Sequence, residues 1–205
     1  ARFLGYQSNL NFRGIRSVYL SYDVPEILPE GIHWLYYGSD KIHFNRITEP
    51  KKLTQFIAPK DKTYLTAEIT FSKGDKIDLM EPETLINEIA QQVEEVNLIE
   101  KNKLVDGSTN KESFVYPLLY EGYHEELAKT RSAINKYQQL YSIGTGGDYN
   151  YADSQILFHK AFDTVAILSG KNSSYTQTIR EVASVDLNQK VTINGKKIGK
   201  GEKTY

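Results

Sequence analysis

A glycine-rich turn followed by a capped helix is the part of this 205-residue chain best suited to chemistry. Gly144, Gly146 and Gly147 permit backbone angles and close approaches that a side chain would prevent. Asp153 and Ser154 are both good N-cap residues for the helix that follows. The free N–H groups and the positive end of that helix favour an anion or a carbonyl-rich ring. This junction is therefore a candidate ligand site.

Two arginines are further candidates. Arg16 and Arg46 lie in or beside predicted strands, and a guanidinium makes paired hydrogen bonds to a diphosphate or a carboxylate. The alternative for each is an ordinary exposed strand residue. His43 is a candidate proton carrier, with a solvent-facing strand histidine as the alternative. The four histidines are too scattered along the sequence to indicate a metal site.

Hydrophobic periodicity predicts the elements that position these residues. Strands are expected at 12–23, 33–37, 42–47, 63–71, 114–118 and 140–143. Helices are expected from Pro82 through Val96, at 124–137, 154–168 and 176–183, and 100–112 is predicted to be a polar loop or mobile hairpin. The helix at 154–168 is expected to bury Ile156, Leu157, Ala161, Phe162, Val165 and Leu168. Asn194-Gly195 between two short β-like runs predicts a terminal hairpin. The fold class is α+β, with a mainly antiparallel sheet and packed helices.

Composition excludes several classes of function. The formal charge is −1, from 25 basic and 26 acidic residues, so electrostatic support for nucleic-acid binding is missing. There is no cysteine, which excludes disulfides and zinc–thiolate sites and fits a cytoplasmic protein. No apolar run approaches the roughly 20 residues of a membrane span, and the first residues lack the apolar core of a signal peptide.

The glycine turn and the residues after it resemble the flavin-dependent amine-oxidase-like proteins, in the branch that contains UDP-galactopyranose mutase. That family ends in a strand, Gly-Arg, a Tyr-x-Tyr-x-Asp motif and a helix that meets the flavin, and here Gly144, Tyr149, Tyr151 and Asp153 have the matching spacing. The segments 16–53, 63–75 and 114–134 are similar to family segments in the same order. The resemblance covers about residues 12–170.

The resemblance implies FAD as the cofactor and assigns roles to several residues. Gly144, Thr145, Asp153 and Ser154 would contact the flavin, and Tyr151 would bind substrate, while Tyr149 is expected to pack. Arg46 and Arg16 are the other candidate substrate-binding residues, on the chemistry of the guanidinium group. Thr145 stands where the family has arginine, and Ser154 where it often has methionine. The parent activity would be an oxidoreductase or mutase reaction, with a nucleotide sugar in polysaccharide biosynthesis as a candidate substrate; no catalytic residue is assigned.

The G-x-G-x-x-G turn that binds the ADP half of FAD in such proteins is not found before Arg16. We therefore interpret residues 1–170 as the substrate-binding, FAD-contacting domain of a flavoprotein without its dinucleotide-binding half, and 171–205 as a helix and hairpin extension. The expected partner is a Rossmann-type half, in the same gene product or in a separate chain. The alternatives are a non-catalytic binding module and one subunit of a split flavoprotein.

Overall fold

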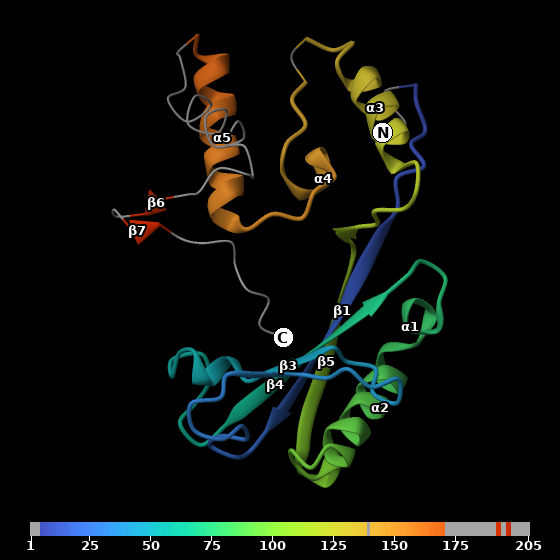
Figure 1. Ribbon diagram of the computed structural model, residues 1–205. Helices are drawn as coiled ribbons and strands as arrows, with labels where there is room; N and C mark the ends of the chain where they lie inside the picture. The colour runs from blue at the N-terminus through green and yellow to red at the C-terminus, as the bar shows by residue number, and fades with distance from the viewer. Residues whose placement is uncertain (1–4, 139, 171–191, 194–195, 198–205) are drawn as a thin grey trace. The chain divides into compact units, whose positions relative to one another are not determined.

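A five-stranded antiparallel sheet is the centre of the fold (Figure 1). The computed structural model describes residues 5–138, 140–170, 192–193 and 196–197. The strand order is β2-β3-β4-β1-β5, and every neighbouring pair is antiparallel. The strands are β1 (Phe12–Tyr22), β2 (Trp34–Tyr36), β3 (Arg46–Thr48), β4 (Thr63–Phe71) and β5 (Leu104–Pro117). The predicted fold class, α+β with a mainly antiparallel sheet, is confirmed.

The two central strands bury one face and leave the other partly exposed. Buried and partly exposed residues alternate along β1 and β4, as expected for a sheet with a single covered face. Val18 lies opposite Ala67 and Leu20 opposite Leu65, and all four are fully buried. The apolar side chains of this face therefore form the core.

Helix α2 (Pro82–Glu95) covers that face. Proline occupies its first turn, where a missing N–H costs nothing, and its buried residues recur at helical spacing. They are Leu85, Ile89, Ala90, Gln92 and Val93. The helix was predicted at this place. A short helix α1 (Lys76–Leu79) precedes it, and the Asp75 carboxylate caps α1 by accepting from the Asp78 N–H at 2.8 Å.

The long strand β5 corrects the prediction of a loop at residues 100–112. A 3₁₀ turn η3 (Lys101–Lys103) leads directly into fourteen strand residues that pair with β1. The polar residues from Asp106 to Glu112 suit a sheet edge, where one side of the strand faces solvent. Gly107 is in this strand because Ile86 of α2 packs against it: a Cβ there would lie 2.5 Å from Ile86 Cγ2.

Other boundaries differ from the predictions by a few residues. The first hairpin is shorter than expected, because only Trp34–Tyr36 and Arg46–Thr48 pair. A 3₁₀ turn η2 (Pro50–Lys52) follows it. Helix α3 spans Tyr123–Ile134, and thus ends three residues before the predicted Tyr137. The bounds of β4 agree with the predicted 63–71.

The chain divides into two compact units, Ala1–Tyr151 and Ala152–Tyr205. The second contains helix α5 (Ser154–Leu168) and the paired strands β6 (Thr192–Ile193) and β7 (Lys196–Lys197). Pairing of Thr192 with Lys197 confirms the strands of the predicted hairpin. The predicted helix at 176–183 and the Asn194-Gly195 turn lie outside the described residues.

Gly107 gives a direct test of how α2 packs on the sheet. We expect Gly107→Ala to lower the free energy of unfolding by about 1–3 kcal/mol, because the new methyl group overlaps Ile86. Gly38→Ala is the matched control, since a Cβ there meets no atom within 4 Å. Urea denaturation measures both, and adding Ile86→Ala should reduce the additional loss that Gly107→Ala causes. Equal stability of the Gly107→Ala and Gly38→Ala variants would contradict this packing.

We expect Tyr22 to make the free energy of unfolding fall at high pH. Its side chain is buried, its hydroxyl has no hydrogen-bond partner among the described residues, and burial raises its pKa to about 12. The unfolded chain loses this proton near pH 10, so the stabilisation is complete below about pH 10 and is lost as the pH rises toward 12. Tyr22→Phe should flatten the dependence of the urea midpoint between pH 9 and 11. Tyr137→Phe, at an exposed tyrosine, should not.

Candidate functional site

The predicted glycine turn is a single helical turn, α4 (Gly144–Asp148). Gly144 has a left-handed φ of +85°, and its N–H donates to Asp148 Oδ2 at 3.2 Å. A Cβ at Gly147 would lie 2.7 Å from the carbonyl carbon of Ser142, so a glycine is required for this close approach. Residues 140–143 do not form the predicted strand. The glycines therefore make a compact turn, but the run before it is irregular.

Tyr149 attaches this turn to the sheet. It is buried, and its hydroxyl oxygen lies 2.6 Å from the Asn11 carbonyl oxygen and 2.7 Å from that of Leu118. Its ring packs edge-on against Phe12, with 5.1 Å between centroids. It ends α4 with φ +52°, a rare conformation for an aromatic residue. The expectation that Tyr149 packs is confirmed.

Asp153 is the N-cap residue of α5, and the helix spans the predicted residues 154–168. Its carboxylate makes no hydrogen bond to the first turn and instead accepts from Gln155 Nε2 at 3.4 Å. The Asp153 side chain is thus not used for capping. The predicted burial of α5 is wrong, because none of its residues is buried and Phe162 is 69% exposed. Most of the large apolar side chains of this helix are exposed to solvent.

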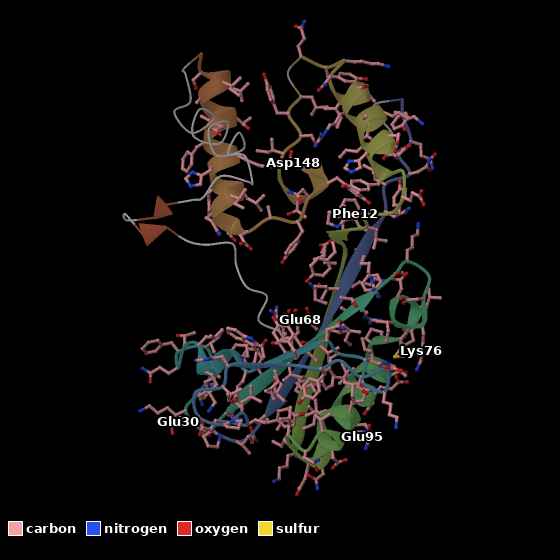
Figure 2. All side chains as sticks on the ribbon, in the orientation of Figure 1. Phe12, Glu30, Glu68, Lys76, Glu95 and Asp148 are labelled. Atoms are coloured by element: carbon pink, nitrogen blue, oxygen red, sulfur yellow. The ribbon has the colours of Figure 1, made fainter. Side chains whose placement is uncertain are left out.

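The open face of the sheet carries a charged and aromatic cluster. Arg46 Nη2 donates to Glu68 Oε1 at 2.5 Å, across the pairing of β3 with β4. Arg46 Nη1 donates to the Tyr36 hydroxyl at 3.3 Å, and the guanidinium lies 5.8 Å from the centre of that ring. The hydrogen bond to Glu68 raises the pKa of Arg46. Figure 2 shows Glu68 on the sheet, away from the helix that carries Glu95.

Two tyrosines extend this cluster toward the glycine turn. The rings of Tyr116, in β5, and Tyr151 are 5.0 Å apart. Burial is the main cause that raises the pKa of Tyr116, with smaller contributions from Tyr151 and Glu68, whereas Arg46 lowers it. Glu68 and Arg46 thus act electrostatically on Tyr116, in opposite directions. We call Tyr36, Arg46, Glu68, Tyr116 and Tyr151 the sheet-face cluster.

Arg16 lies on the opposite face, in the core. It is buried, and its Nη1 donates to the carbonyl oxygens of Ile77 at 2.9 Å and Met80 at 2.5 Å. Its guanidinium therefore fixes the segment between α1 and α2 to β1. A substrate contact by Arg16 stays a prediction.

His43 belongs to the helix-covered side of the fold and does not lie in a strand. The His43 ring atom Nε2 is 3.1 Å from Glu88 Oε2, and the His43 backbone N–H donates to Gln92 Oε1 at 2.9 Å. Glu88 and Gln92 are both on α2. The interpretation of His43 as a strand residue is therefore wrong. In the part of the chain that the structure describes, no three His, Cys, Asp or Glu residues gather into a metal site.

The structure joins some of the predicted site residues and adds others. Arg46 and Tyr151 belong to the sheet-face cluster; Gly144 and Thr145 lie in the first unit and Asp153 and Ser154 in the second. The residues that the sequence reasoning missed are Tyr36, Glu68 and Tyr116. Of these three, only Glu68 could have been selected from the sequence, because it is the one charged residue in the alternating pattern of β4. None of the described helices has the length and apolar character that a membrane crossing requires.

Comparison of the sequence with family models and with curated proteins finds no match. Comparison of the structure does find similar folds. A crystal structure of reduced UDP-galactopyranose mutase superimposes with a TM-score of 0.68 at 19% identity, over 79% of this chain and 34% of that protein. A protein described as a putative protoporphyrinogen oxidase from Exiguobacterium sp. 255-15 gives 0.52 at 16% identity, over 67% of this chain and 31% of that protein.

These comparisons show the class of fold. The chain spans about a third of the length of each of these two proteins. At such identities the likeness concerns the fold alone: the chain shares the fold of part of these two proteins. The family resemblance that the sequence suggested is thus supported at the level of the fold.

Tyr149 provides a test of how the glycine turn is attached. We expect Tyr149→Phe to lower the free energy of unfolding by about 1–2 kcal/mol, because the substitution removes the hydroxyl that lies within hydrogen-bond distance of the Asn11 and Leu118 carbonyl oxygens and accepts from the Asn11 backbone N–H. Tyr141→Phe removes a hydroxyl from an exposed tyrosine and should change the free energy of unfolding little. Urea denaturation followed by circular dichroism measures both. A Tyr149→Phe variant as stable as the parent would contradict the attachment.

Proposed function

We propose that this chain is the substrate-binding half of an FAD-dependent oxidoreductase or mutase, which acts together with a Rossmann-type dinucleotide-binding half. The observation that carries the proposal is the fold likeness to UDP-galactopyranose mutase over 79% of the chain. The dinucleotide-binding half belongs to the same gene product or to a separate chain. The absence of cysteine agrees with a cytoplasmic enzyme.

The residues proposed to hold the flavin fit that role by their chemistry. Gly144 and Thr145 offer backbone groups to a ligand. The space beside Gly144 is open, because a Cβ built there would have no atom within 4 Å. Ser154 opens a fifteen-residue helix whose N-terminus favours electron-rich groups. The Asp153 carboxylate makes no cap hydrogen bond, so it is available to accept from a ligand. When bound, the flavin would supply the electron-transfer or covalent chemistry, and these residues would orient it.

The sheet-face cluster is proposed to bind the substrate. Tyr36 is 69% exposed and Tyr151 is 61% exposed, so both offer ring faces and hydroxyl groups. Hydrogen bonds to Glu68 and Tyr36 orient the Arg46 guanidinium, and the Glu68 carboxylate offsets part of its positive charge. A nucleotide sugar of polysaccharide biosynthesis is the candidate substrate: its sugar would lie on the tyrosines, and Arg46 would serve the diphosphate. Arg16 remains a further predicted contact, but not to the same group, because its side chain is buried on the opposite face of the sheet.

One observation favours a second candidate function. Thr145 stands where the resembling family has arginine, and a threonine cannot replace the charge or the paired hydrogen bonds of a guanidinium. A binding module that retains the sheet but carries out no flavin chemistry would tolerate this substitution. Flavin uptake by the assembled protein separates the two candidates.

Cofactor binding by the 205-residue chain tests the proposal. The ADP half of FAD supplies much of the affinity in this fold, so the chain alone should be colourless and bind FAD no tighter than roughly 10⁻⁴ M. Together with a dinucleotide-binding half it should become a yellow protein. In that assembly Asp153→Ala should weaken FAD binding by about tenfold with less than about 1 kcal/mol lost in stability, because the side chain makes no cap hydrogen bond.

Two controls separate the flavin role of Asp153 from a helix effect. Asp153→Asn retains a good N-cap residue but removes the charge, so it distinguishes capping from electrostatics. Asp40→Ala removes an exposed carboxylate from the loop between β2 and β3 and should leave FAD affinity unchanged. Tight FAD retention by the chain alone would contradict the half-site proposal. Absence of flavin uptake by the assembly would favour the binding module.

A further inference from the structure

A pocket of about 480 Å³ lies beside the ends of β1, β4 and β5, away from the sheet-face cluster. Phe12, Phe71 and Phe114 contribute its aromatic lining, one from each strand. Phe71 belongs to the helix-covered face of β4, on the other side of the sheet from Glu68. The pocket is therefore separate from the site proposed for the substrate.

The backbone is shaped to make room for this aromatic lining. A β-bulge interrupts the pairing of β1 with β5 between Arg13 and Ile15. At the bulge, a Cβ on Gly14 would lie 2.5 Å from Phe71 Cε1 and 2.6 Å from the Glu112 carbonyl oxygen. Any residue other than glycine would displace the Phe71 ring. The bulge therefore holds Phe71 where it forms part of the pocket wall.

One aromatic side chain is left unusually open. Phe114 is 72% exposed, although its ring meets Phe12 edge-on with 5.7 Å between centroids. An exposed phenylalanine beside a partly buried one offers a stacking surface that water solvates poorly. A flat apolar group in the pocket would cover this surface.

Two ammonium groups stand at the same pocket. Lys111 Nζ lies 2.8 Å from Asp78 Oδ1 and 5.7 Å from the centre of the Phe71 ring. The hydrogen bond from Lys111 is the main cause that lowers the pKa of Asp78. Lys73 is exposed and makes no ion pair with any residue that the structure describes. With Lys73 and Lys111 positive and Asp78 negative, the lining carries a net charge of +1.

We propose that this pocket binds a small aromatic carboxylate. The ring would lie against Phe12, Phe71 and Phe114, and the carboxylate would accept hydrogen bonds from Lys73, with Lys111 adding a second positive charge. A charge-assisted hydrogen bond at the rim and an aromatic surface inside are complementary to an anion with a flat ring. A neutral apolar ligand would leave Lys73 unpaired, and a simple inorganic anion would leave the aromatic surface exposed.

The pocket also adjoins the attachment of the glycine turn. Asn11 and Phe12 line it, and these two residues contact Tyr149 through the carbonyl oxygen of Asn11 and the ring of Phe12. A ligand that orders Asn11 and Phe12 would therefore order Tyr149 and α4. We infer an effector site, whose occupation stabilises the turn. This inference rests on the pocket alone and does not depend on the flavin role of the turn.

Binding of 2-naphthoate and of its neutral analogue 2-naphthamide tests the proposal, by isothermal titration calorimetry on the 205-residue chain. We expect the carboxylate to bind about fivefold more tightly than the amide. Lys73→Gln should remove that difference, and Phe114→Ala should weaken both ligands by about fivefold. Lys60→Gln, at an exposed lysine in another loop, is the matched control and should change neither.

Backbone amide NMR locates the binding. Shifts at Asn11, Lys73, Lys111 and Phe114 on adding 2-naphthoate would support the pocket, and accompanying shifts at 144–149 would support the link to the turn. Lys73 and Phe114 are both exposed, so their variants should fold. Circular dichroism is the check on folding. Equal affinity for acid and amide, or affinity unchanged by Lys73→Gln and Phe114→Ala, would overturn the proposal. Shifts confined to other residues would overturn it as well.

Discussion

The close packing of α2 on one face of the antiparallel sheet is the constraint on which the rest of this fold depends. It requires a glycine under the helix at Gly107, and it concentrates the apolar side chains of β1 and β4 on the covered face. The residues of the other face are then free to be polar or aromatic. Arg46 and Glu68 lie there because the alternation of a strand forces every second side chain to the face that α2 leaves open.

A second arrangement connects the sheet to the glycine turn. The Tyr149 hydroxyl contacts the backbone just before β1 and just after β5, so the turn depends on the ends of the central strand β1 and of the edge strand β5. Tyr116 and Tyr151 are in contact within the same unit. The sheet therefore positions both the cluster proposed for the substrate and the turn proposed for the cofactor. The exposed apolar side chains of α5 agree with the proposal that this helix packs against a partner domain.

Local periodicity was sufficient to predict some elements, but not the contacts made across the fold. The alternation of Thr63–Phe71, and the N-cap residue type of Asp153 with the periodic run of Ser154–Leu168, predicted the correct bounds. The last residues of β5 were predicted as a strand at 114–118, but its first part was missed because the residues there are polar and Gly107 serves a distant neighbour, Ile86. Glu49 is fully buried and accepts hydrogen bonds from the Leu28 N–H and the Thr63 hydroxyl. Nothing in the local sequence distinguishes such a carboxylate from an exposed one.

Hydrogen exchange on the chain assembled with a dinucleotide-binding half would test the central claim most directly. If the glycine turn and the start of α5 hold the flavin, adding FAD should slow amide exchange at 144–148 and 154–157 and leave the loop at 38–43 unchanged, since bound backbone groups open less often. Protection confined to the added half, with residues 144–157 exchanging as before, would contradict the account.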